Sequence, residues 1–383
     1  MKRALSVFLD HSGLLVAGTM LALAWANFAH QNYERVAHTL RFAVNDVGMA
    51  FFFALAAKEV VEATAPGGAL HSPRRSAVPL IAALGGMIGP AAIYAVLVLV
   101  LDRPDLMRGW AIPVATDIAF SYLVARIIFG ARHPGIPFLL LLAIADDALG
   151  LVILAVFYHT GELHLAAFAI VLSVALTLAW WLRKRRTLSF WPYVVGAGTL
   201  SWLAFYWGGL HPALALVPVM PLVPHAARDA GFFVESPSRD TLNAFERWWK
   251  VPVQVILFFF GFVNAGVEVT SVAAGTWIVL AAILIGKPIG IVSCTALSVA
   301  AGLHLPNGVT WRDLTVLGMV AAIGFTVALF FATAAFPAGE LLDQTKMGAL
   351  LSFSAAIVAV IAAFLLRVGR AAAARRCRAS LLC

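Results

Sequence analysis

The hydrophobic positions of this chain fall into long runs separated by short polar stretches. Windowed hydropathy predicts twelve membrane-spanning segments, most of them long enough to cross the roughly 30 Å hydrocarbon core as a helix. The runs are 12–28, 42–62, 76–100, 111–129, 136–157, 163–182, 190–207, 210–225, 248–267, 275–302, 314–336 and 345–367. The predicted fold class is an all-α polytopic membrane protein.

Two adjacent acids, Asp146 and Asp147, lie at the midpoint of the run 136–157. A charged residue at the bilayer centre costs about 2.5–3.5 kcal/mol even on a lenient scale. Packing does not explain the pair, because Leu or Ala would fill such positions better. Carboxylate oxygens suit hard ions, so Asp147 and Asp146 are candidate ligands of sodium or lithium. Two neighbouring carboxyls titrate as one coupled unit, and their protons compete with the cation.

Composition excludes an ordinary soluble protein. Of the 383 residues, 62% are hydrophobic and 12% charged, whereas soluble domains have about 25% charged residues. The net charge of +8 does not indicate a nucleic-acid partner, because the basic residues cluster at the ends of apolar runs. We interpret the basic run 183–186 as a cytoplasmic anchor. The three cysteines form neither a disulfide framework nor a metal motif, and no cofactor is expected.

Lys and Arg are unequally distributed between alternate connections. With the N-terminus inside, 20 of the 27 lie in segments assigned to the cytoplasm and five lie outside. This asymmetry predicts cytoplasmic N- and C-termini, with the lipid bilayer as partner. We interpret 12–28 as a retained helix, because further spans follow it.

Two runs contain residues that interrupt a helix. The run 111–129 holds Pro113 with Thr116 and Asp117, and 314–336 holds Gly324 beside Thr326. Non-helical backbone at membrane depth survives only against protein or a water-filled cavity. Paired interrupted segments in the two halves of a transporter indicate a substrate site. The alternatives are ordinary, since Gly is common in membrane helices and Pro can begin one.

A short internal echo is consistent with inverted repeats. The motifs GGMIG at 85–89 and GKPIG at 286–290 both have Gly first and fifth and Ile fourth. Each lies in the span before an interrupted one. Spans three to five would then repeat spans ten to twelve in inverted orientation, although glycine-rich helix contacts are frequent in membranes.

The remaining buried charges admit two interpretations each. Lys287, between Gly286 and Pro288, is predicted to be buried and to pair with Asp146; the alternative is a snorkelling anchor. Asp117 is either a ligand or, as we favour, a partner of half-helix N-termini.

Five further polar residues lie near the ends of spans. Asp46 follows Asn45 and is a candidate cap for the outer end of its span. Glu59 is a candidate for an inner mouth, and Lys58 and Glu62 have i,i+4 spacing. His211, before Pro212, resembles a structural histidine.

Together these residues resemble the bacterial NhaA sodium/proton antiporters. The matching strings occur in the family's order over nearly the whole chain: VNDVGMAFFF at 44–53, AALGGMIGPA at 82–91, GWAIPVATDIAF at 109–120, LAIADD at 142–147, FVNAGV at 262–267, LIGKPIGI at 284–291 and IGFTVALFFA at 323–332.

The resemblance implies twelve helices with interrupted, crossed helices four and eleven, and electrogenic exchange of cytoplasmic sodium or lithium for more than one external proton by alternating access. One membrane domain over 1–383 is expected. It would have a core bundle from 76–157 and 275–367, an interface or scaffold part from 12–62 and 163–267, and a basic tail, 368–383.

The resemblance also implies roles for single residues. Asp147 is similar to the main cation ligand, and Asp146 to its partner with Lys287. Thr116 and Asp117 match the helix crossing. Glu59 resembles an acid of the cytoplasmic funnel, Asp46 one on the periplasmic side, and His211 a histidine linked to pH response.

Three departures from the family pattern concern dimerisation and pH regulation. The connection 29–41 is shorter than the segment that forms a β-hairpin in many members, so the chain is either a monomer or a homodimer. After Glu59 it reads VVE in place of VKRE, and the loop 225–250 reads ERWWKVP in place of an LHPW-like string. We therefore expect a shallow pH response governed by proton–cation competition.

Two rival functions fit the sequence less well. An intramembrane aspartyl protease would need a GxGD motif, which the sequence lacks. A transport-dead regulator would not need Asp146, Asp147 and Lys287 to be intact.

Overall fold

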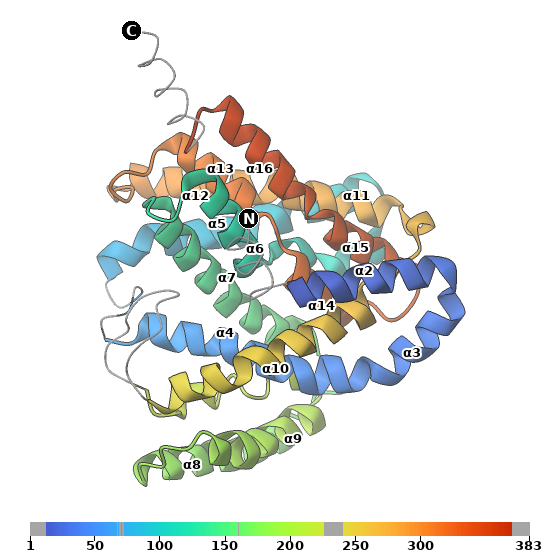
Figure 1. Ribbon diagram of the computed structural model, residues 1–383, viewed down its shortest axis with the longest axis vertical. Coiled ribbons are helices and arrows are strands. Elements are labelled where there is room, and N and C mark those ends of the chain that lie inside the picture. The colour runs from blue at the N-terminus through green and yellow to red at the C-terminus, as the bar shows by residue number, and fades with distance from the viewer. Residues whose placement is uncertain are drawn as a thin grey trace. The chain divides into compact units, whose positions relative to one another are not determined.

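A computed structural model of the chain describes residues 13–66, 68, 70, 73–159, 161–225 and 240–369. Every regular element in these residues is a helix (Figure 1). The chain forms two compact units. Unit 1 comprises Met1–Ser72 and Ala148–Glu268, and unit 2 comprises Pro73–Asp147 and Val269–Cys383. The predicted basic tail, 368–383, lies outside the described residues except for its first two.

Unit 1 contains five long α-helices and several short elements. Its helices are α2 (Gly13–Phe28), α3 (His30–Phe42), the π-helix η1 (Ala43–Gly48), α4 (Met49–Thr64), the second half of α7 (Gly135–Phe157), α8 (Leu165–Lys184), the π-helix η4 (Pro192–Gly198), α9 (Thr199–Gly208), the 3₁₀ turns η5 (Pro212–Leu214) and η6 (Met220–Leu222), and α10 (Thr241–Asn264).

Unit 2 holds both interrupted segments. Its helices are α5 (Pro73–Val100), the 3₁₀ turns η2 (Pro104–Gly109) and η3 (Ile112–Val114), α6 (Ile118–Phe129), the first half of α7 (Gly135–Phe157), η7 (Val269–Ser271), α11 (Ala274–Ala281), the π-helix η8 (Ala282–Gly286), α12 (Lys287–Ala300), α13 (Trp311–Ala321), α14 (Phe325–Ala335), α15 (Glu340–Leu351) and α16 (Ser354–Leu365).

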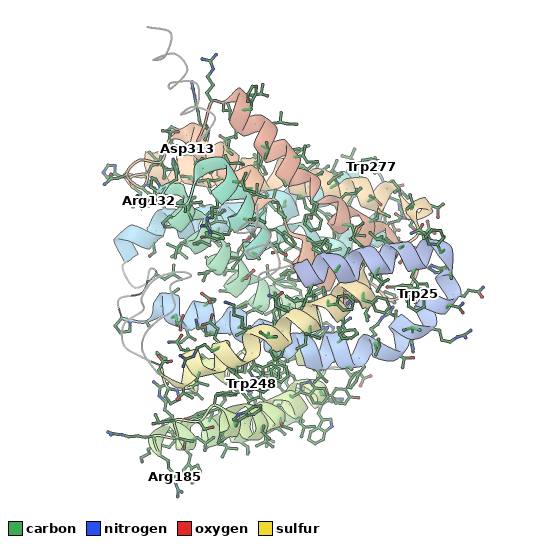
Figure 2. The ribbon with its side chains drawn as sticks, in the orientation of Figure 1. Trp25, Arg132, Arg185, Trp248, Trp277 and Asp313 are labelled. Atoms are coloured by element: carbon green, nitrogen blue, oxygen red, sulfur yellow. The ribbon has the colours of Figure 1, made fainter. Side chains whose placement is uncertain are left out.

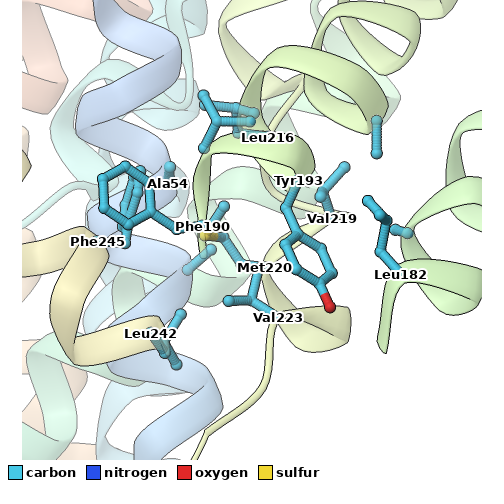
Figure 3. Close-up of a cluster of buried hydrophobic side chains, with 14 of the residues drawn as sticks. Ala54, Leu182, Phe190, Tyr193, Leu216, Val219, Met220, Val223, Leu242 and Phe245 are labelled. Carbon is cyan, nitrogen blue, oxygen red and sulfur yellow. The ribbon is translucent and has the colours of Figure 1, made fainter. Parts of the chain in front are cut away.

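An apolar cluster forms one core of unit 1 (Figure 3). Tyr193 from η4 and Met220 from η6 meet Ala54 of α4 and Phe245 of α10, and all four are almost fully buried. Elsewhere in the unit, α2 and α10 approach so closely that a Cβ on Gly18 would overlap the carbonyl of Phe258. Side-chain packing and close backbone contact therefore both hold this unit together.

The described residues include seven helices that are long and apolar enough to cross a membrane, and the bent pair α13–α14 is an eighth candidate. One of the seven runs from His30 to Thr64. The short connection at 29–41 is itself almost entirely helical, because α3 continues into η1 and α4. Asp46 lies inside η1, so it does not cap the outer end of a span.

The expected helix at 210–225 is also wrong. Residues 212–223 form 3₁₀ turns and other turns that are mostly buried. Four prolines explain this outcome, because each removes a backbone N–H and clashes with the preceding helical turn. The prolines are Pro212, Pro218, Pro221 and Pro224. Non-helical backbone of this kind is tolerated in a membrane protein where protein surrounds it.

Two basic features differ in exposure. Lys346 lies within α15 and is buried. Arg185 lies exposed at the end of α8 (Figure 2), where its guanidinium stacks 3.9 Å from the ring centroid of Trp181. The run 183–186 thus combines basic heads with an aromatic surface, which is typical of a membrane-interface segment.

Candidate cation site

The site is built on α7, which has Asp146 and Asp147 near its middle. Asp146 is 2% exposed and Asp147 is half-buried. The surrounding stretch of α7, from Phe138 to Ala145, is buried and apolar. Two carboxylates are therefore held in a region with little water to solvate them, where a charge needs a partner.

Lys287 provides that partner for one of the acids. Its Nζ lies 2.8 Å from Oδ2 of Asp146, and the lysine is fully buried. Nζ also donates to the carbonyl of Val114, the last residue of η3. The C-terminal end of a helical turn carries partial negative charge, so a cation is favourable there. Lys287 is thus a buried ion-pair partner and not a snorkelling anchor.

Thr116 completes the hold on the same carboxylate oxygen. Its hydroxyl lies 2.6 Å from Oδ2 of Asp146 and 3.1 Å from the carbonyl of Ala321. By contrast, Oδ1 of Asp146 is buried without a hydrogen-bond partner among the described residues. The Asp147 carboxylate likewise accepts no hydrogen bond within the described part of the chain. Two neighbouring acids therefore present oxygens that no protein donor occupies.

The two interrupted segments meet at their breaks. The first break is Ala115–Asp117, between η3 and α6, and the second is Ala322–Gly324, between α13 and α14, whose axes are bent by 49°. The amide of Asp117 donates to the carbonyl of Ile323 at 2.7 Å. Ser121 of α6 donates to the carbonyl of Val320 at 3.0 Å. Side chains and backbone from one segment thus satisfy polar groups that the other leaves open.

Asp117 caps two helices at once. Its Oδ1 accepts from the amide of Phe120, at the start of α6, at 3.3 Å. Its Oδ2 accepts from the amide of Thr326 at 3.4 Å and from the Thr326 hydroxyl, at the start of α14. Both carboxylate oxygens are therefore engaged by the positive ends of two half-helices. This geometry favours the dipole-partner interpretation of Asp117 over direct ligation.

Of the eight candidate residues, five lie together in unit 2: Thr116, Asp117, Asp146, Asp147 and Lys287. The other three belong to unit 1. Asp46 lies 3.9 Å from Nδ1 of His211, and that nitrogen faces the amide of Ala213 at 3.4 Å.

Glu59 belongs to a cluster centred on Lys58. Nζ of Lys58 lies 2.6 Å from Glu62, 2.7 Å from Glu246 and 3.6 Å from Glu59. The expected i,i+4 pair with Glu62 is present, and Glu246 of α10 joins it. Three carboxylates around one buried lysine leave this cluster net negative.

Sequence reasoning missed the direct roles of Thr326, Ser121 and Glu246. A hydroxyl residue directly after a break in a buried run was the available signal for Thr326. No local signal identifies Glu246, because 188 positions in the sequence separate it from Lys58. The described residues also contain no cluster of three or more His, Cys, Asp or Glu side chains suited to a tightly held metal.

Comparison with known proteins decides the family. The sequence profile of the family described as Na+/H+ antiporter 1 matches residues 5–366. This chain belongs to the Na+/H+ antiporter 1 family. The resemblance seen in the sequence is thereby confirmed, as is the expectation of a transporter rather than an enzyme.

Individual relatives of this family member cover almost its whole length. It is 44% identical over 380 residues to the Na(+)/H(+) antiporter NhaA of Geobacter metallireducens, covering 97% of this chain and 100% of the relative. It is also 44% identical over 416 residues to NhaA of Jannaschia sp., covering 96% and 99%. The structure of a sodium proton antiporter from Methanocaldococcus jannaschii has a similar fold, with a TM-score of 0.55 at 13% identity over 92% of this chain and 91% of that one.

Proposed function

We propose that this chain exchanges cytoplasmic sodium or lithium for external protons at Asp146 and Asp147. The observation that carries the proposal is the charge balance of the buried site. Lys287 compensates one of the two acids, and Asp117 is balanced by two helix N-termini, each worth about half a charge. One negative charge remains, and a buried uncompensated charge is strongly unfavourable. A cation or a proton removes it.

The same oxygens receive either ion. Lys287 and Thr116 hold Oδ2 of Asp146, so Oδ1 is left for the cation together with the Asp147 carboxylate. Carboxylate oxygens match the preference of sodium and lithium for hard ligands. A proton on the pair neutralises the charge that would attract the cation. Occupation by one ion therefore excludes the other, which is the condition for coupled exchange.

We infer that the exchange is electrogenic. Exchange of one sodium ion for one proton would carry no net charge, so a second titrating group is required. The Asp146–Lys287 pair is the buried ionisable group that adjoins the oxygens without protein donors. In this scheme a proton binds Asp146 when Lys287 separates from it, and the cycle moves two protons for each sodium ion.

Alternating access is the proposed transport mode. All five site residues lie within unit 2, so movement of that unit re-exposes the site without rebuilding it. We propose that unit 2 is the transporting core and unit 1 the scaffold. Asp46, His211 and Glu59 would then line the access paths or influence the pH response.

We also propose the finer topology expected from the sequence. Twelve crossings, with 210–225 crossing as buried turns and with segments four and eleven crossed at their breaks, would place both termini in the cytoplasm. A bacterial inner membrane is the expected location. Because α3 occupies the position of the missing hairpin, a homodimer would need a different contact.

Transport by purified protein in proteoliposomes tests the proposal. Addition of sodium to vesicles holding a pH gradient should dissipate the gradient. Asp147→Asn should abolish this response, because an amide offers neither the charge nor the proton site, while the variant folds with a normal melting temperature. Asp105→Asn, in the exposed turn η2, is a control that should keep full activity. Sodium-dependent dissipation by Asp147→Asn would refute the site assignment.

A further inference from the structure

The two motifs that echo each other in the sequence also contact each other in unit 2. GGMIG, 85–89, lies in α5, and GKPIG, 286–290, runs from the end of η8 into α12. A Cβ built on Gly85 would overlap the carbonyl oxygen of Gly290, and one on Gly89 would overlap that of Gly286. The first glycine of each motif faces the last glycine of the other. A local two-fold axis between antiparallel helices would produce this arrangement.

The same local two-fold axis would relate the second positions of the two motifs, but these positions carry different residues. The second residue is Gly86 in GGMIG and Lys287 in GKPIG. A Cβ on Gly86 would lie 3.1 Å from Cγ1 of Ile291 and 3.8 Å from Cε of Lys287. The absent side chain at 86 therefore leaves space beside the lysine stem. The symmetric contact thus carries one ammonium group instead of two.

The backbone around Lys287 is constrained on two further sides. The π-helix η8 ends at Gly286, and such wide turns are frequent at functional positions. On α13, a Cβ on Gly318 would lie 3.1 Å from Cα of Pro288. The residues before and after Lys287 are therefore both in close contact with neighbouring backbone.

We propose that Gly89 and Gly286 are positioning residues for Lys287, with Gly85 and Gly290 as the second half of the contact and Gly86 as the space for the lysine stem. This inference rests on the cation site proposed above. Its physical content is a distance. Non-bonded carbon atoms settle about 3.5–4.0 Å apart, so a methyl at this contact requires roughly 1 Å of separation. If Lys287 moved away from Asp146 by the same amount, the Nζ–Oδ2 distance, now 2.8 Å, would become too long for a hydrogen bond.

A loosened lysine changes binding more than turnover. Lys287 fixes Oδ2 of Asp146, and that tether orients Oδ1 toward the cation. When the tether lengthens, both carboxylates remain but the ligand set is no longer preorganised. Apparent sodium affinity should fall about two- to tenfold, the range for one weakened polar contact. The maximal rate per folded transporter should remain within twofold of the original.

The experiment compares Gly286→Ala and Gly89→Ala with a matched control, Gly18→Ala. The control creates the same kind of overlap with a backbone carbonyl, but between α2 and α10 of unit 1. Apparent sodium affinity and maximal rate are measured in proteoliposomes at several pH values, with melting temperature in detergent. The two test variants should have a weaker apparent affinity for sodium. Gly18→Ala should have a lower melting temperature and an unchanged apparent sodium affinity. Gly86→Ala, whose methyl would meet side-chain atoms of Ile291 and Lys287 and no backbone carbonyl, should show a smaller shift in the same direction.

The outcomes separate the two proposals. Unchanged affinity in Gly86→Ala and in the folded test variants overturns the positioning role, as does an equal affinity loss in Gly18→Ala. Where Gly286→Ala and Gly89→Ala do not fold, Gly86→Ala decides. If Asp147→Asn still transports, the cation site itself is wrong. If Asp147→Asn is inactive while the glycine variants keep their affinity, only the positioning inference fails.

Discussion

Removal of Lys287 should leave a buried acid without its partner. Lys287→Met keeps a long apolar stem but deletes the ammonium that contacts Asp146 at 2.8 Å. It also deletes the donor to the Val114 carbonyl. Asp146 and Val114 are both buried in the described structure, so water does not replace the contacts that they lose. Transport should be lost together with stability.

The magnitude follows from burial. Lys287 is 0% exposed and Asp146 is 2% exposed, so solvent does not screen their attraction as it screens an ion pair at the surface. Breaking such a pair by removing one partner costs about 3–5 kcal/mol. Removing both charges leaves no unpaired charge at position 146, although the Val114 carbonyl still lacks its donor. Lys287→Met with Asp146→Asn should therefore be less destabilised than Lys287→Met alone. The double-mutant cycle should give a coupling of about 2–3 kcal/mol.

Thermal unfolding in detergent, followed by tryptophan fluorescence, measures the four members of the cycle. The double variant should melt above the lysine single variant and remain inactive. The wild type, both single variants and the double variant are compared at one pH and one sodium concentration, because bound sodium also stabilises the fold. An unchanged melting temperature for Lys287→Met would refute the buried pair. Equal melting of the single and double variants would show that the charges are not coupled.

Two further predictions concern the helix caps and the pH response. Thr326→Val deletes the hydroxyl that donates to Asp117 and should lower the free energy of unfolding by about 1 kcal/mol. The control is Thr333→Val in the same helix, whose hydroxyl donates to the Phe330 carbonyl; this variant should change the melting temperature little. Equal effects of the two variants would count against the double cap. Competition at one site predicts that higher sodium moves the activity profile to lower pH at constant maximal rate, and that Glu246→Gln beside Lys58 leaves the profile unchanged. A maximal rate that collapses below neutral pH at saturating sodium, or a profile altered by Glu246→Gln, would instead assign pH control to the Lys58 cluster.

Much of the organisation was predictable from local signals. Hydrophobic runs identified the class and most helices, because the bilayer demands apolar side chains over a set length. Pro113, Thr116 and Gly324 marked the breaks, since Pro and Gly weaken the interior of a helix and Thr is a poorer helix former than Ala. Asp146, Asp147 and Lys287 stood out because intramembrane charge is costly enough to require a function.

Helix continuity was less predictable. Residues 30–42 are polar enough to suggest a connection, yet α3 extends the following span because helical hydrogen bonds form within one segment whatever surrounds it. The apolar run 210–225 suggested a helix, yet its prolines cannot donate to one. Hydropathy measures compatibility with lipid and does not measure backbone hydrogen bonding.

By itself, the sequence determined the family, the membrane class and the central charges, because all three are written in local composition and short motifs. Only the tertiary structure decided which groups meet. It brought Thr326 to Asp117 across 209 positions, Lys287 to Asp146 across 141, and Glu246 to Lys58. It also placed the two glycine motifs, 85–89 and 286–290, in direct backbone contact beside Lys287. Such pairings depend on how whole helices pack, and each member alone has a local alternative that the sequence cannot reject.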